Sequence, residues 1–285
     1  VDENFHLLGL VTVRDLIMAP TGQRLDQFMA QPAARLRPED DQERAVEQMD
    51  RLDQVELPVV DEADRLIGTV TADDAMDVMQ AEATEDMERM AAMAPSEQPY
   101  LRTRVWDLYR SRIFWLLLLM LSATFSGMII THFESALAAC VVLTSFDTML
   151  SGTGGNSGSQ SSVAVIRALA LGEEEFSDML AVVWKELQVA LLCGVCLAAA
   201  NFVKMMVVDC WLLANPTVTP AVAAVVCCTL VGTVACAKLV GASLPILAEK
   251  IGFDPAVMAS PFISTIVDAL SLLIYFRFAT WILGV

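Results

Sequence analysis

Basic residues are scarce in this sequence, above all in its first hundred positions. Those positions hold 23 acidic side chains against 8 lysines and arginines, whereas the remaining 185 residues hold 12 against 10. An acidic part therefore precedes a nearly neutral one. A nucleic-acid partner is not expected for either part, because neither offers a positive surface to phosphates.

Cysteine is absent from the first 139 residues, and all seven cysteines lie in the apolar part. Cys193 and Cys196 form a C-x-x-C pair inside a hydrophobic run rather than at a strand-to-helix turn. We interpret them as small buried apolar side chains and not as a redox centre. A secretory signal is also missing, and Val1 as the first residue leads us to expect a fragment of a longer chain.

An internal repeat marks the acidic part. The segment starting at Val1 matches the segment starting at Val60 at a constant offset of 59, with eight of fifteen positions identical. Each copy predicts a strand end, a polar turn, a short strand and then a helix. Residues 57–60 and 66–71 are the predicted strands of the second copy, and a helix is expected from Thr71 or Ala72. The pattern resembles a CBS-domain pair that lacks most of its first module, and such pairs sense adenine nucleotides or metal ions.

The predicted helix from about residue 72 to 93 is strongly acidic. Its carboxylates are Asp74, Asp77, Glu82, Glu85, Asp86 and Glu88. Like charges three or four residues apart destabilise a helix by roughly 0.2–0.5 kcal/mol each. The segment is therefore either a solvated face or a surface that binds divalent cations, which would relieve the repulsion. The same two interpretations apply to Asp41, Glu43 and Asp53.

Five membrane spans are predicted in the second part, at about 113–133, 136–170, 183–208, 218–247 and 259–284. Four arginines between residues 102 and 112 precede the first span and predict a cytoplasmic amino terminus. With five spans, the carboxyl terminus is then expected outside. The fold class we predict is mainly α: a five-helix polytopic membrane domain, preceded by a partial α/β module and a connecting helix.

Two polar features interrupt these apolar spans. Residues 151–160 read SGTGGNSGSQ, ten small or polar residues within the second span, and Asp268 is a lone carboxylate in the last. An ionisable group at membrane depth costs at least ~2.5 kcal/mol, so it normally faces a polar cavity or an ion path. Glycines allow backbones to approach closely. Together the two features predict a cation path.

Three further polar residues remain open to more than one interpretation. Asp147 lies one turn before the glycine motif, within the same span. Lys238 lies in the middle of the fourth span and either pairs with a carboxylate or extends toward the membrane surface. Glu134, in a predicted outer loop of residues 132–136, is either an entrance group or a solvated carboxylate.

These residues resemble a known family. The stretch GTGGNSGSQ at 152–160, IRALA at 166–170, DPA at 254–256 and TIVD at 265–268 are similar to MgtE-type magnesium channels. The order of a CBS pair, an acidic connecting helix and five spans is also similar. The resemblance divides the chain into the end of a first CBS module (1–20), a second module (21–80), a connecting helix and linker (81–111) and a pore domain (112–285).

The resemblance implies roles for individual residues. Asp268 matches the pore carboxylate, which both subunits of a homodimer supply around one hydrated Mg²⁺, and Gly152 and Asn156 match pore-lining positions. Carboxylates that bind Mg²⁺ in the closed state are matched by Glu82, Glu85, Asp86 and Asp254. Sensor positions in the second CBS module are matched by Asp41, Glu43, Asp53, Asp74 and Asp77.

The function implied is a channel, not an enzyme, that moves Mg²⁺ across the plasma membrane into the cytoplasm. Intracellular Mg²⁺ bound to the acidic region closes it, and ATP is a candidate ligand of the CBS pair in the full-length protein. Asp147-Thr148 departs from the apolar residue and proline that often precede the motif in the family, which leaves ion preference open. The magnesium assignment agrees with the oxygen ligands that Mg²⁺ prefers and with the absence of a cysteine beside Asp268 in sequence.

Three alternative functions compete with this one. A CBS-regulated transporter of another divalent ion such as Co²⁺ or Mn²⁺ would carry the same features. An intramembrane aspartyl protease would need two carboxylates, such as Asp147 and Asp268, but a Gly-x-Gly-Asp context is missing around Asp268. A membrane-tethered sensor without transport would leave Asp268 unexplained.

Overall fold

The computed structural model describes residues 1–96, 98–174 and 176–284, with the side chain of residue 260 left out. The chain divides into two compact units, Val1–Glu85 and Asp86–Val285. Each unit is described separately below.

The first unit combines short helices with one two-stranded sheet. Its elements are α1 (Val13–Met18), η1 (Leu25–Gln27), α2 (Gln42–Arg51), β1 (Glu56–Val60), β2 (Leu66–Thr71) and α3 (Ala72–Met90), which continues into the second unit. β1 and β2 are antiparallel, and Glu56 pairs with Thr71. The two predicted strands and the helix start are confirmed. The helix ends at Met90, whereas we expected an end near residue 93.

The two copies of the repeat share their turn and cap geometry. Oδ1 of Asp2 accepts hydrogen bonds from the backbone N–H groups two and four residues later, and Oδ1 of Asp61 does the same. Thr12 and Asp15 cap α1, and Thr71 and Asp74 form the same exchange at the start of α3. In each exchange the threonine hydroxyl donates to the aspartate and lowers the pKa of that carboxyl. The repeat is therefore a structural one.

A small core holds the first unit together. One side of α2 is buried against β1 and the first turn of α3, and the residues in this core are Leu36, Ala45, Val46, Met49, Leu57 and Ala75. Leu57 is fully buried because it lies on the sheet face that α2 covers. Pro58 and Val60 are buried as well, so both faces of β1 are covered.

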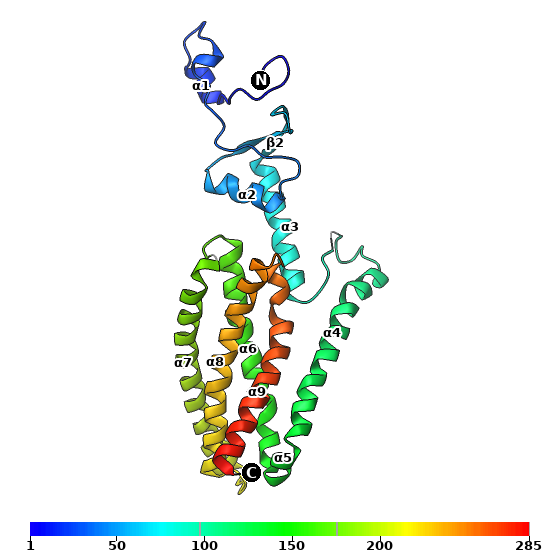
Figure 1. Ribbon diagram of the computed structural model, residues 1–285, viewed down its shortest axis with the longest axis vertical. Coiled ribbons are helices and arrows are strands. Elements are labelled where there is room, and N and C mark those ends of the chain that lie inside the picture. The colour runs from blue at the N-terminus through cyan, green and yellow to red at the C-terminus, as the bar shows by residue number, and fades with distance from the viewer. Residues whose placement is uncertain (97, 175, 285) are drawn as a thin grey trace. The chain divides into compact units, whose positions relative to one another are not determined.

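The second unit is a helical bundle (Figure 1). Its helices are α4 (Val105–His132), α5 (Glu134–Ala139), α6 (Thr144–Ala170), α7 (Met179–Lys204), α8 (Pro220–Lys250) and α9 (Ser260–Leu283). Shorter segments are η2 (Val141–Leu143), η3 (Phe176–Asp178), the π-helix η4 (Met205–Leu212) and η5 (Pro255–Met258). α8 packs against α6, α7 and α9, and it carries more buried residues than the other helices do in the described part of the chain.

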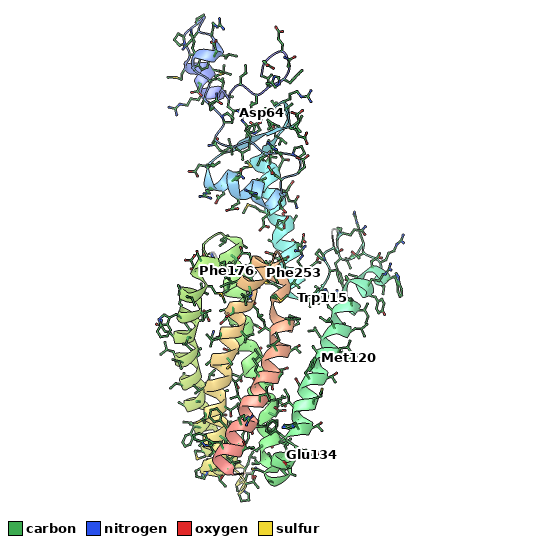
Figure 2. All side chains as sticks on the ribbon, viewed as in Figure 1. Asp64, Trp115, Met120, Glu134, Phe176 and Phe253 are labelled. Atoms are coloured by element: carbon green, nitrogen blue, oxygen red, sulfur yellow. The ribbon has the colours of Figure 1, made fainter. Side chains whose placement is uncertain are left out.

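The two ends of the bundle differ. Phe176 and Phe253 lie at the end where α6 and α8 finish and α7 and α9 begin, and Glu134 lies at the opposite end (Figure 2). We call the first of these the Asp254 end, because Asp254 begins η5 there. α4 contacts α5 and α9 but has no buried residue, so its apolar side chains face outward as they would toward lipid.

The expected spans are largely confirmed, with one correction. Among the residues that the structure describes, four stretches are long and apolar enough to cross a membrane: Val105–His132, Phe176–Leu212, Pro220–Lys250 and Pro255–Leu283. α6 has a comparable length of 27 residues, but its polar motif makes it less apolar. The span predicted at 136–170 is wrong as a single helix, because the chain turns at Cys140 and η2 before α6 begins. Glu134 consequently lies in the first turn of α5 and not in a loop.

Tyr275 helps to fix the turn that the apolar pattern did not reveal. Its hydroxyl, on α9, donates to the carbonyl of Leu143 at 2.8 Å. Leu143 and Phe146 are buried in the same apolar cluster as Tyr275. No glycine or proline lies between residues 134 and 151, so tertiary contacts rather than local turn chemistry define this bend.

Small residues let α6 approach its neighbours closely. A Cβ atom added to Gly241 of α8 would lie 2.2 Å from the carbonyl oxygen of Gly158 on α6. One added to Gly154 would lie 2.5 Å from Thr233 of α8 and 2.8 Å from Val267 of α9. The glycine motif therefore brings the backbone of α6 against both helices.

Gly241→Ala tests this contact. The new methyl group would overlap a backbone carbonyl that cannot rotate away, and overpacking of this kind typically costs about 1–3 kcal/mol. We expect a lower thermal midpoint in detergent and less folded protein. Gly152→Ala, where no heavy atom lies within 4 Å, is the control and should retain the midpoint. Equal midpoints for both variants would contradict the proposed close packing.

Candidate functional site

The motif on α6 has two different faces. Gly154, Ser157, Gly158 and Ser161 are buried in the bundle. Thr148, Gly152, Asn156 and Gln160 follow one another at intervals of four residues, and all four are exposed in the single chain. We call this second set the polar stripe. One face therefore packs, and the other offers amide, hydroxyl and backbone oxygens to whatever lies beside it.

Asp268 lies on α9 in the segment that packs against the motif. A Cβ atom added to Gly154 would contact Val267 of α9, and one added to Gly155 would contact Ser264 of α9. Asp268 is partly exposed, eight residues after the start of α9. With a rise of about 1.5 Å per residue, it lies about 12 Å from the Asp254 end. The fold thus brings Asp268 and the α6 motif to one helix–helix contact.

Asp147 is near this contact as well. It lies on α6 before the motif, and α6 packs against α9, the helix that carries Asp268. Sequence reasoning placed both residues within spans, but the packing of α6 against α9 is a feature of the structure. Among the described ranges 1–96, 98–174 and 176–284, no group of three or more His, Cys, Asp or Glu side chains is arranged to hold a metal ion.

Asp254 has two partners at its end of the bundle. Its Oδ1 accepts a hydrogen bond from the backbone of Ala256 at 2.7 Å, which caps η5, and its Oδ2 pairs with Arg89. Met90 packs against Ile166, Ala256 and Ala259. The last turn of α3 is therefore held against the ends of α6 and α9 by an ion pair and an apolar contact.

Arg89 is the residue that sequence reasoning missed here. We expected Asp254 to be grouped with the carboxylates Glu82, Glu85 and Asp86, and that grouping stays a prediction. The signal was present, because Arg89 is the sole basic residue among the 19 residues of α3. A single cation in an acidic helix can pair with a carboxylate elsewhere on the same domain.

The predicted sensor residues have structural roles in the first unit. Asp41 caps α2 and accepts a hydrogen bond from the backbone of Glu43 at 2.9 Å. Asp53 follows α2 with a φ of 51°, and Asp74 is part of the exchange with Thr71. Their side chains and those of Asp77 and Glu82 are exposed or partly exposed, and Glu82 accepts a hydrogen bond from Gln42 at 2.7 Å. Their metal-binding role remains a prediction.

Lys238 pairs with a carboxylate, which decides between the two interpretations left open. Its Nζ lies 3.5 Å from Oε2 of Glu186 on α7, and both side chains are largely buried. Glu186 was not identified from the sequence. It lies seven residues after the start of α7, and a charge that close to the end of a span is compatible with a solvated position.

The C-x-x-C pair is a pair of free thiols. Cys196 is exposed and Cys193 is partly exposed, so the expectation that both would be buried is wrong. α7 packs mainly against α8, which leaves its other face outside the bundle. The apolar character of the cysteines suits a lipid-facing position equally well.

The two units define a class of protein: a multi-pass membrane protein that carries a partial α/β module ahead of its membrane domain. Residues 148–278 match a family described as MgtE, divalent cation transporter, and residues 25–81 match the CBS domain. The membrane domain is therefore similar to the MgtE family, and the resemblance noted from the sequence is confirmed.

Three relatives extend the match over nearly the whole chain. A magnesium transporter MgtE from Thermus thermophilus is 37% identical over 283 residues, which cover 99% of this chain and 61% of the relative. Proteins of the same name from Bacillus subtilis and Enterococcus faecalis are 34% and 31% identical, covering 98% of this chain and 60% and 59% of the relatives. The chain thus spans about three fifths of the length of the relatives it matches.

Proposed function

We propose that this chain forms a Mg²⁺-selective channel that moves Mg²⁺ across the plasma membrane into the cytoplasm. One observation carries the proposal: the packed face of the α6 motif contacts α9 next to Asp268, so that the exposed polar stripe and Asp268 lie on two adjoining helices of the membrane domain. The names of the three relatives support magnesium as the ion.

The chemistry of the two features suits a hydrated magnesium ion. Mg²⁺ dehydrates reluctantly and prefers six oxygens in an octahedral shell. A carboxylate at Asp268 attracts the cation, and the amides of Asn156 and Gln160 and the open backbone at Gly152 can bind water molecules of its shell. The carboxylate supplies charge, and the neutral groups replace bulk water.

Asp268→Asn and Asp268→Ala test the ion site. Both remove the charge, and the asparagine keeps the shape, so we expect Mg²⁺ flux into liposomes to fall to the level of empty liposomes in both. Asp209→Asn is the matched control, because Asp209 in η4 pairs with Lys204 at 3.1 Å and has no proposed role in conduction. Normal flux through the Asp268→Asn variant would move the site elsewhere, with Asp147 as the first residue to test.

The same assay separates the alternatives. Comparing Mg²⁺, Mn²⁺, Co²⁺ and Ca²⁺ identifies a transporter of another divalent ion. An aspartyl protease built on Asp147 and Asp268 would instead cleave transmembrane peptides and conduct nothing. Two carboxylates on the packed helices α6 and α9 are compatible with both functions, whereas the polar stripe favours conduction.

The active form is proposed to be a homodimer. In one chain Asn156 and Gln160 are exposed on a helix of the membrane domain, where lipid offers them no hydrogen bonds. A second copy related by a two-fold axis would cover the stripe and place a second Asp268 beside the first. Two carboxylates match a divalent ion better than one does.

Mass measurement of the protein released from lipid nanodiscs tests the dimer. We expect a mass of two chains, and crosslinks between α6 segments of different copies. A population made only of monomers that nevertheless conducts Mg²⁺ would contradict the dimeric pore.

Gating is proposed to follow the Mg²⁺ concentration at the Asp254 end, which we place on the cytoplasmic side with the amino terminus. Mg²⁺ bound by the acidic residues of α3 holds this helix at the pore mouth and closes the channel. Arg89 already neutralises Asp254, so the ion acts mainly on the carboxylates that precede Arg89. ATP bound to the complete CBS pair is a further proposed regulator.

Replacing Glu82, Glu85 and Asp86 with their amides tests this mechanism. The variant loses the charges that Mg²⁺ bridges, so half-inhibition should need about fivefold more internal Mg²⁺ or higher. Ion selectivity should not change. Glu47→Gln, on the exposed side of α2, is the control. An unchanged inhibition curve in patch recordings would show that the acidic face is merely solvated.

A further inference from the structure

A buried polar network links three helices of the membrane domain behind the motif. Ser161 of α6 donates a hydrogen bond to Oε2 of Glu186 on α7 at 2.5 Å. Nζ of Lys238 on α8 donates to the oxygen of Ser161 at 3.1 Å. The serine hydroxyl thus lies between the two charges, and its side chain is 1% exposed.

Stability alone does not explain this network. Removing two charges from water costs several kcal/mol per ion, and apolar residues of similar size are often neutral or stabilising replacements. Neither Glu186 nor Lys238 belongs to the polar stripe or to the Asp268 contact. Ionisable groups buried in a membrane domain are therefore expected to have a further role.

The network lies beside the closest approach of α6 and α8. Lys238 is three residues before Gly241, whose Cβ position the carbonyl of Gly158 blocks, and Ser161 is three residues after Gly158. Residues three apart lie on the same side of a helix. The glycine contact contains no directional bond between side chains, whereas the hydrogen bonds of Ser161 to Glu186 and Lys238 define one position of α6 along its axis.

Fixing α6 along its axis also fixes the polar stripe. Gln160 precedes Ser161 directly, and Asn156 lies five residues earlier on the same continuous helix. The hydrogen bond from Ser161 to Glu186 joins α6 directly to α7, so Glu186 connects the outer helix to the motif. A displacement of α6 by one residue would move each stripe group by about 1.5 Å relative to Asp268.

We propose that Glu186, Lys238 and Ser161 are positioning residues that hold the polar stripe in register with Asp268 and thereby determine ion selectivity. This inference rests on the proposed channel function. In this proposal the network itself binds no ion. The three side chains act through α6 and do not touch the permeating ion.

Ser161→Ala is the sharpest test, because it removes the bond to α6 and leaves the Lys238–Glu186 pair between α7 and α8. We expect a folded protein whose discrimination of Mg²⁺ against Ca²⁺ in liposome flux is about tenfold weaker than that of the parent chain. Ser162→Ala is the matched control. Ser162 is the adjacent serine, it is also fully buried, and its hydroxyl donates to the carbonyl of Met258 instead. The control should retain the selectivity of the parent.

A second variant keeps the inference testable if Ser161→Ala does not fold. Glu186→Gln combined with Lys238→Met removes both charges together, so no unpaired ion remains buried, and the same loss of selectivity is expected. A network that only stabilises the fold would lower the thermal midpoint and leave the selectivity ratio of the folded protein unchanged. Parent selectivity in both variants overturns the inference. A parent chain that conducts no Mg²⁺ overturns the proposed function itself.

Discussion

The contact between the carbonyl of Gly158 and Gly241 is the constraint on which the membrane domain depends. At this point α6 and α8 approach until no side chain fits between them. Lipid offers little hydrophobic driving force between helices, so close backbone packing of this kind is a main source of association. Because α8 also packs against α7 and α9, its contact with α6 determines where the polar motif lies in the bundle.

Because of this constraint, the two faces of the short α6 motif have different functions. Glycine and serine on the buried face allow the approach, and larger polar groups on the exposed face remain available to an ion and its water. The Lys238–Ser161–Glu186 network lies beside the Gly158–Gly241 contact and adds directional hydrogen bonds, which the glycines cannot supply. Packing, register and ion chemistry are thereby combined within about three turns of α6.

Periodicity and local chemistry predicted much of this structure. The repeat, the β1–β2 hairpin and the positions of α7, α8 and α9 follow from patterns that depend on neighbouring residues in the sequence. The turn at Cys140 did not, because the bond from Tyr275 to Leu143 joins residues 132 positions apart. The partners Arg89 and Glu186 were missed for the same reason: which charges meet is decided by helix packing.

The accessibility of residue 156 tests the central claim most directly. Asn156→Cys, in a chain whose seven native cysteines are replaced, would be exposed to a small cationic thiol reagent. Leu192→Cys on α7, which is 75% exposed and faces outward, is the reference. The account predicts fast modification at position 156 that stops Mg²⁺ flux and is slowed by Mg²⁺. Modification no faster than at position 192, or modification that leaves the flux intact, would contradict an ion path along the polar stripe.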